Sequence, residues 1–113
     1  MDVHKIKDFK GGWFIGDFKP AVFKNPFFEV GHQHHKKGTV GQRHTHKVTT
    51  ELTYVVSGSM VVNDHQVQRE RHFTDGFMFI YHPNEISEVT FLEDTDLIVV
   101  RWPSVPSDKY MVD

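Results

Sequence analysis

The sequence predicts an all-β fold of the jelly-roll or barrel kind. Short runs rich in β-branched and aromatic residues follow one another at nearly even spacing, which is typical of sandwiches, jelly rolls and closed barrels. Turn-forming pairs such as Asn25-Pro26, Asn63-Asp64 and Asp75-Gly76 separate these runs. No stretch shows the 3.6-residue apolar period of an amphipathic helix, so a helical or mixed fold is excluded.

Taken in order, the apolar runs and the breakers between them define the expected elements. We expect strands at 12–15, 21–23, 27–35, 42–46, 51–57, 59–63, 66–71, 76–81, 88–91 and 96–102. The remaining stretch, 103–113, is expected to form an extended C-terminal tail whose tip, Tyr110 to Val112, packs back on the body. At 113 residues the chain is expected to be a single domain, 1–113, with its barrel core at about 25–102.

Composition narrows the class of protein further. Ten Phe, three Tyr and two Trp allow a short chain to bury a large apolar area. The absence of Cys excludes disulfides and thiolate metal sites. A formal charge of −2, with no basic stripe, excludes strong attraction to nucleic acid. Without an apolar run for a signal peptide or a membrane span, we expect a cytoplasmic protein with no membrane partner.

Two of the expected strands are apolar on both faces, at 52–56 and 97–100. A strand reads this way when one face lines a core and the other meets a second sheet or another subunit. We therefore expect a homodimer, with a second sheet of the same chain as the alternative.

Nine histidines in so short a chain point to a functional site. His44 and His46 are two residues apart on an expected strand, so both imidazoles project from the same face of the sheet. Glu51 follows a short turn and can return a carboxylate to that face. Two imidazoles and one carboxylate form a facial ligand set that suits a divalent metal and leaves coordination positions open.

The segment 38–58 resembles the first motif of the cupin superfamily, G-x5-H-x-H-x3,4-E-x6-G. The fixed positions of that motif fall on Gly38, His44, His46, Glu51 and Gly58. The resemblance implies a cupin-type jelly-roll β-barrel and a divalent metal, Fe, Mn, Ni or Zn, held by His44, His46 and Glu51. It names no catalytic residue and implies a small-molecule ligand.

The second cupin motif, G-x5-P-x-G-x2-H-x3-N, is degenerate in this chain. Asn84 stands near the usual turn glycine, and Asn tolerates positive φ better than most residues. The usual histidine position falls on Ser87, which leaves the fourth metal ligand open. Candidates for that ligand are His82, His32 and His34, each with the alternative of being an ordinary surface or barrel histidine.

Three functions are compatible with these residues. The first is a divalent-metal-dependent enzyme acting on a small polar metabolite such as a sugar or sugar acid, as an isomerase, ring-opening enzyme or dioxygenase. The second is a metal-free sugar-nucleotide ketoisomerase that uses the His-x-His pair as acid and base. Such enzymes commonly carry Gln where this chain has Glu51, and a carboxylate favours metal. The third is a ligand-binding cupin without catalysis.

Overall fold

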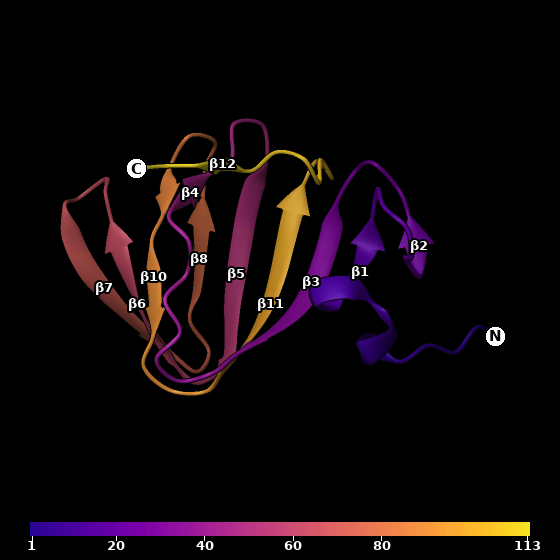
Figure 1. Ribbon diagram of the computed structural model, residues 1–113, viewed down its shortest axis with the longest axis horizontal. Coiled ribbons are helices and arrows are strands. Elements are labelled where there is room, and N and C mark those ends of the chain that lie inside the picture. Colours follow the sequence, from indigo (N-terminus) through magenta and orange to yellow (C-terminus); the bar gives the residue numbers. More distant parts are fainter.

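Strands from two sides of the molecule enclose one apolar core in the computed structural model, which describes residues 1–113 (Figure 1). One side is a six-stranded sheet in the order β2-β1-β3-β11-β5-β8. Its strands are β1 (Trp13–Gly16), β2 (Phe23–Lys24), β3 (Glu29–His35), β5 (Thr50–Ser57), β8 (Met78–Tyr81) and β11 (Thr95–Trp102). All neighbours pair antiparallel except β1 and β2.

Two three-stranded sheets form the other side. One has the order β10-β6-β7, and its strands are β6 (Ser59–Asp64), β7 (Arg69–Thr74) and β10 (Val89–Phe91). The other has the order β12-β4-β9, and its strands are β4 (His44–Thr45), β9 (Ile86–Ser87) and β12 (Tyr110–Met111). The expected all-β jelly roll is confirmed, although the sheets do not join into one continuous hydrogen-bonded barrel.

The hydrophobic core lies between the six-stranded sheet and the β10-β6-β7 sheet. Its buried members are Val55, Met60, Val62, Phe73, Phe91, Leu97 and Val99. They come from β5 and β11 on one side and from β6, β7 and β10 on the other. This packing removes apolar surface from water and so holds the two sides together. Polar side chains gather at the end of the molecule nearest β4.

Most expected strands form within a few residues of their predicted limits, with β7 as the clearest exception. It was expected at 66–71 and forms at Arg69–Thr74. A turn occupies the residues before it, where Gln68 adopts a φ of 53° that a strand does not tolerate. The two short 3₁₀ turns, Ile6–Asp8 and Lys10–Gly12, were not expected. No helix in the structure is long and apolar enough to cross a membrane.

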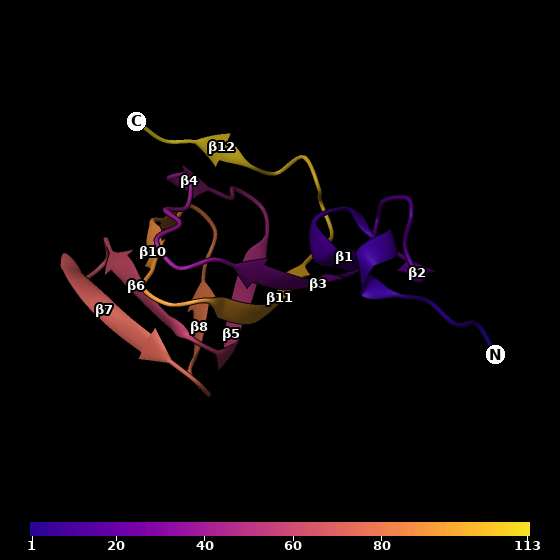
Figure 2. The same ribbon diagram turned by 60° about the horizontal axis from the view of Figure 1, so that its bottom comes forward.

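The C-terminal tail packs back on the body, as expected from the sequence. Tyr110 pairs with Thr45 and Met111 with His44, which makes the tail an edge strand of the β12-β4-β9 sheet. Turning the molecule shows this segment passing over β4 at one end of the barrel (Figure 2).

The strands that read as apolar on both faces, β5 and β11, are neighbours in the six-stranded sheet. Their inward residues, including Val55 and Val99, are buried. Their outward residues, such as Leu52 and Ile98, are only partly covered. The homodimer therefore stays a prediction.

Candidate functional site

A row of polar side chains crosses the inner face of the six-stranded sheet at the end nearest β4. Arg101 in β11 lies directly opposite Glu29 in β3 and Glu51 in β5, and Glu51 lies opposite Tyr81 in β8. Directly opposed residues have adjacent Cβ atoms, so strand register alone brings these four side chains together. The row is mostly buried, since Glu29 and Glu51 are 2% and 7% exposed.

The two histidines of the first motif approach this row from the facing side. The rings of His44 and His46 lie edge to face, with centroids 5.1 Å apart and an interplanar angle of 89°. In each ring Nδ1 contacts a backbone carbonyl oxygen, that of Gln42 for His44 and that of Asp108 for His46. A carbonyl only accepts, so the neutral tautomer compatible with these contacts carries its proton on Nδ1 and keeps the lone pair on Nε2.

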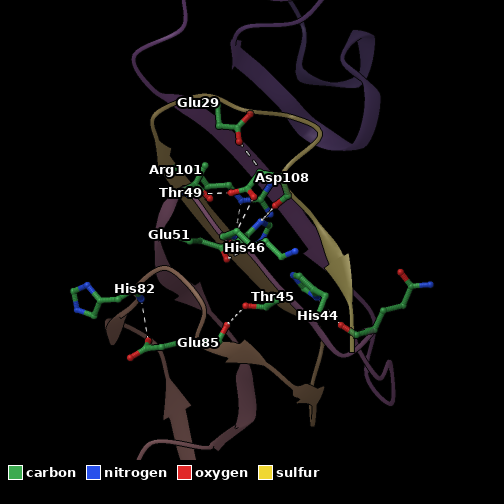
Figure 3. A network of polar contacts seen from close by, with 12 residues as sticks. Glu29, His44, Thr45, His46, Thr49, Glu51, His82, Glu85, Arg101 and Asp108 are labelled. Atoms are coloured by element: carbon green, nitrogen blue, oxygen red, sulfur yellow. Dashed lines mark hydrogen bonds and ion pairs between the residues drawn. The ribbon is translucent and has the colours of Figure 1, made fainter. Parts of the chain in front are cut away.

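His46 and Glu51 face each other inside the site. The Nε2 atom of His46 lies 3.7 Å from Oε2 of Glu51, and it is buried without a hydrogen-bond partner. A buried acceptor nitrogen without a partner is costly, which makes it a natural position for a metal or a substrate donor. Figure 3 shows His46 and Glu51 at the same end of the barrel, with His44 close by.

The side chains do not form a complete metal site in the positions that they occupy. In the positions they hold here, no three or more His, Asp or Glu side chains form a group that could hold a metal ion. The donor chemistry of His44, His46 and Glu51 still fits a divalent metal, because two imidazole nitrogens are free of protein partners on their metal-binding side. The second oxygen of Glu51 is not free.

Arg101 occupies that second oxygen. Its Nη2 lies 3.3 Å from Oε1 of Glu51, and its Nη1 lies 3.7 Å from Oε1 of Glu29. The guanidinium also sits over the ring of Trp13, 4.5 Å from the centroid. Sequence reasoning missed Arg101, although the alternation that points Leu97 and Val99 inward extends to it.

Glu29 is the second residue that sequence reasoning missed. Burial raises the pKa of its carboxyl above the ordinary value, although the nearby charge of Arg101 opposes that rise. Ser104 of the tail donates a hydrogen bond to Oε2 of Glu29 at 3.3 Å. No sequence motif marks this position, because its role depends on the register between β3 and β11.

Ser87, which the sequence aligns with the usual histidine of the second cupin motif, is the last residue of β9. It is 8% exposed and stands directly opposite His44 in the pairing of β4 with β9. The preceding turn is closed by Asn84, whose φ of 73° bears out its expected role in place of glycine. A serine hydroxyl is a poor substitute for an imidazole ligand, so this side of the site stays open.

None of the three candidate histidines supplies the missing ligand. His32 and His34 project from the outer face of β3, where both lie near Asp96, with His34 Nδ1 at 2.8 Å from Oδ1. His82 is exposed, and Figure 3 shows its ring pointing away from the site while its backbone N–H donates to Glu85. The structure therefore brings His44, His46 and Glu51 together and leaves these three outside.

The site opens into a cavity of about 710 Å³, within the range of small-molecule pockets. Its formally charged lining residues are Glu51, Arg101 and Lys109, the last from the C-terminal tail. Burial lowers the pKa of His44, so its imidazole is neutral at pH 7. Arg101 is already paired with Glu51 and Glu29, so Lys109 is the lining cation that no carboxylate of the chain pairs with.

Comparison with solved structures places the chain among proteins of one architecture. No protein-family model and no curated protein sequence matches it. The structure of KdgF from Halomonas sp. matches with a TM-score of 0.67 and 23% identity, over 73% of this chain and 74% of that one. A Klebsiella pneumoniae protein with a double-stranded β-helix domain matches with a TM-score of 0.71 and 17% identity, over 80% and 75%.

An enzyme is also among the similar structures. A sugar phosphate isomerase of the cupin superfamily from Silicibacter pomeroyi matches with a TM-score of 0.63 and 20% identity. The match covers 77% of this chain and 57% of that protein, so the isomerase is substantially longer than the part that is similar. At these identities the comparisons establish the shared fold and nothing finer.

Proposed function

Since this chain has the cupin fold, we propose that it is a metal-binding cupin enzyme acting on a small polar metabolite, a sugar or sugar acid. The observation that carries the proposal is the buried, unpartnered Nε2 of His46, 3.7 Å from Glu51 and beside His44. His44, His46 and Glu51 would hold the metal. A bound divalent metal would polarise a carbonyl or enediolate oxygen of the substrate.

The other lining residues suit an anionic substrate of this class. Lys109 provides a positive charge in the cavity lining that no carboxylate of the chain pairs with, and a sugar acid brings a carboxylate to match it. Burial lowers the pKa of His44, which favours the neutral imidazole that a metal ligand requires. Ser87, small and buried opposite His44, leaves room for the substrate where an imidazole would stand.

Metal content tests the proposal. The protein, purified without a histidine-rich tag and incubated in turn with Fe²⁺, Mn²⁺, Ni²⁺ and Zn²⁺, is analysed by inductively coupled plasma mass spectrometry after desalting. We expect stoichiometric metal in the wild type and none in the His44→Ala/His46→Ala variant. His72→Ala is the matched control, because His72 bonds Ser59 on the surface away from the site. Equal metal in all three proteins would contradict the proposal.

One observation favours a metal-free alternative. The ion pair between Arg101 and Glu51 already neutralises the carboxylate, which a metal would otherwise do. In that case His44 and His46 would act directly as acid and base on a nucleotide sugar. A wild-type protein that contains no metal but binds a nucleotide sugar would support this function. One that contains no metal and turns over neither class of substrate would support a binding role.

A further inference from the structure

The C-terminal segment Ser104–Met111, called the strap below, makes several specific contacts with residues of the site. Its strand β12 pairs with β4, the strand that begins with His44. Just beyond the strap, the N–H of Val112 donates to the carbonyl of Arg43 at 3.1 Å. These bonds fix the strap across the end of the barrel that contains the histidines, as Figure 2 shows.

At the centre of the strap, Asp108 binds the turn that links β4 to β5. Its side chain accepts hydrogen bonds from the backbone N–H groups of Lys47, Val48 and Thr49, each at 2.9 Å. Asp108 is 3% exposed, and burial alone would raise its pKa. The three donors outweigh burial and hold the pKa of this carboxyl below its ordinary value, so it is ionised near neutral pH.

The backbone of the same residue contacts a motif histidine. The carbonyl oxygen of Asp108 accepts the hydrogen bond from Nδ1 of His46, which fixes both the tautomer and the rotation of that ring. The opposite nitrogen, Nε2, then points toward Glu51 with its lone pair free. In Figure 3, Asp108 and Thr49 lie on one side of His46 and Glu51 lies on the other.

We propose that Asp108 is a positioning residue for the site: its carboxylate clamps the 47–49 turn so that its own carbonyl holds His46 with Nε2 aimed at Glu51. The carboxylate and the carbonyl act together, because the three N–H bonds fix where the carbonyl lies relative to the imidazole. The part of this inference that concerns metal affinity rests on the proposed function. The part that concerns the tautomer of His46 does not.

A second anchor supports the role of the strap in the site. Ser104, 4% exposed, donates to Glu29, and its hydroxyl oxygen accepts the N–H of Asp17 at 2.8 Å. Glu29 in turn pairs with Arg101. The strap is therefore attached to the site at two points, at Glu29 through Ser104 and at His46 through Asp108.

The test reads the His46 tautomer in the full-length protein, freed of metal with a chelator and labelled with ¹⁵N in its histidines. Two-bond ¹H–¹⁵N spectra at pH 8 distinguish a proton on Nδ1 from one on Nε2, and a His46→Gln spectrum assigns the signal. We expect the Nδ1–H form in the wild type and a mixture of tautomers in Asp108→Ala. The matched control is Asp75→Ala, which removes a carboxylate that caps the N–H of Gly58 far from the site.

Zinc affinity, measured by isothermal titration, gives the second readout. Loss of a group that orients a ligating histidine typically weakens metal binding about 10- to 100-fold, and we expect this for Asp108→Ala but not for Asp75→Ala. If Asp108→Ala does not fold, Asp108→Asn replaces it, because the amide keeps the volume and one acceptor oxygen.

The outcomes separate the two claims. A wild-type His46 with its proton on Nε2 would overturn the proposal without any variant. So would a folded Asp108 variant with an unchanged tautomer, or equal effects of Asp75→Ala and Asp108→Ala. If the wild type binds no zinc while the tautomer shifts as expected, the positioning role stands and the metal function fails.

Discussion

The inner and outer faces of the six-stranded sheet differ in the polarity of their side chains at the end nearest β4. On the inner face, Glu29, Arg101 and Glu51 form a row across β3, β11 and β5. One residue along each strand, Val30, Val100 and Leu52 form the corresponding row on the outer face. In a one-layer soluble sheet the polar row would meet water and the apolar row would be buried.

Here the polar row is largely buried and the apolar row is only half-buried, and each of these departures has its own cause. Burying two carboxylates and a guanidinium costs free energy that their pairing offsets only in part, so the inner row indicates selection for a site rather than for stability. The outer row continues to Ile80 in β8, which is 44% exposed, and Met78 on the same face, opposite Tyr54, is 61% exposed. Exposed apolar side chains gathered on one face are typical of surfaces that contact another molecule.

The largest effect is expected at the site that the inner face forms together with His44 and His46. Replacing His46 with Ala should abolish divalent metal binding, because it removes the ligand with the unpartnered, buried Nε2. Glu51→Gln should weaken binding severely without unfolding the protein, since the amide retains the shape of the side chain but not its charge. Isothermal titration with Zn²⁺ measures both. Wild-type affinity in a His44/His46 double variant would show that the polar inner face is not a metal site.

The next largest effect is expected on the outer face. We propose that a second copy of the chain covers it, so that light scattering at micromolar concentration reports twice the 13.2 kDa chain mass. Val100→Lys places an unpaired charge in that contact, which costs about 3 kcal/mol or about 100-fold in association. Val67→Lys is the control, because Val67 is exposed in the turn before β7. A monomeric wild type would refute the dimer.

Tighter metal binding is expected when a fourth ligand is added to the site at Ser87. Ser87→His places an imidazole opposite His44 and should tighten Zn²⁺ binding about tenfold, or about 1.4 kcal/mol. The same variant should lose activity, because the new side chain fills the open side of the site. Titration and turnover of the same preparation check both effects. Unchanged affinity would mean that Ser87 does not face the metal.

The smallest effect is expected at the mouth of the cavity. Lys109→Gln removes an exposed cation from the lining and should weaken binding of glucuronate about fivefold, the size of an exposed ion pair. Binding of glucose, which lacks the carboxylate, should not change. Lys47→Gln is the control, since its ammonium lies over the ring of Tyr110. A loss of both sugars in parallel would show that Lys109 shapes the cavity rather than recognising charge.

Much of this organisation follows from the sequence because it depends on local spacing. His44, His46 and Glu51 meet because a two-residue repeat puts two rings on one face and a short turn returns the carboxylate. Gly58 is required where φ is 118°, and a Cβ there would lie 2.4 Å from Oγ1 of Thr95. Both features can be recognised in a short segment of the chain.

The rest depends on contacts between distant segments, which local patterns do not encode. Arg101 joins the site only because β11 pairs with β5 in one register and with β3 in another. Asp108 joins it only because the tail returns across the barrel end, about sixty residues after the turn that it binds. A tail of mixed composition predicts packing of its tip but not which backbone groups it binds.

The sheet that carries His44 is also the smallest in the molecule, and this has a consequence for how the site behaves in time. The strands β12, β4 and β9 have two residues each, whereas β5 and β11 have eight. Segments with few backbone bonds open with less free energy than the global unfolding reaction. Amide protons of the small sheet should therefore exchange with solvent through local opening while those of β5 remain protected. A ligand that requires the closed site would slow exchange in the small sheet selectively, which makes hydrogen exchange a way to find ligands before any reaction is known.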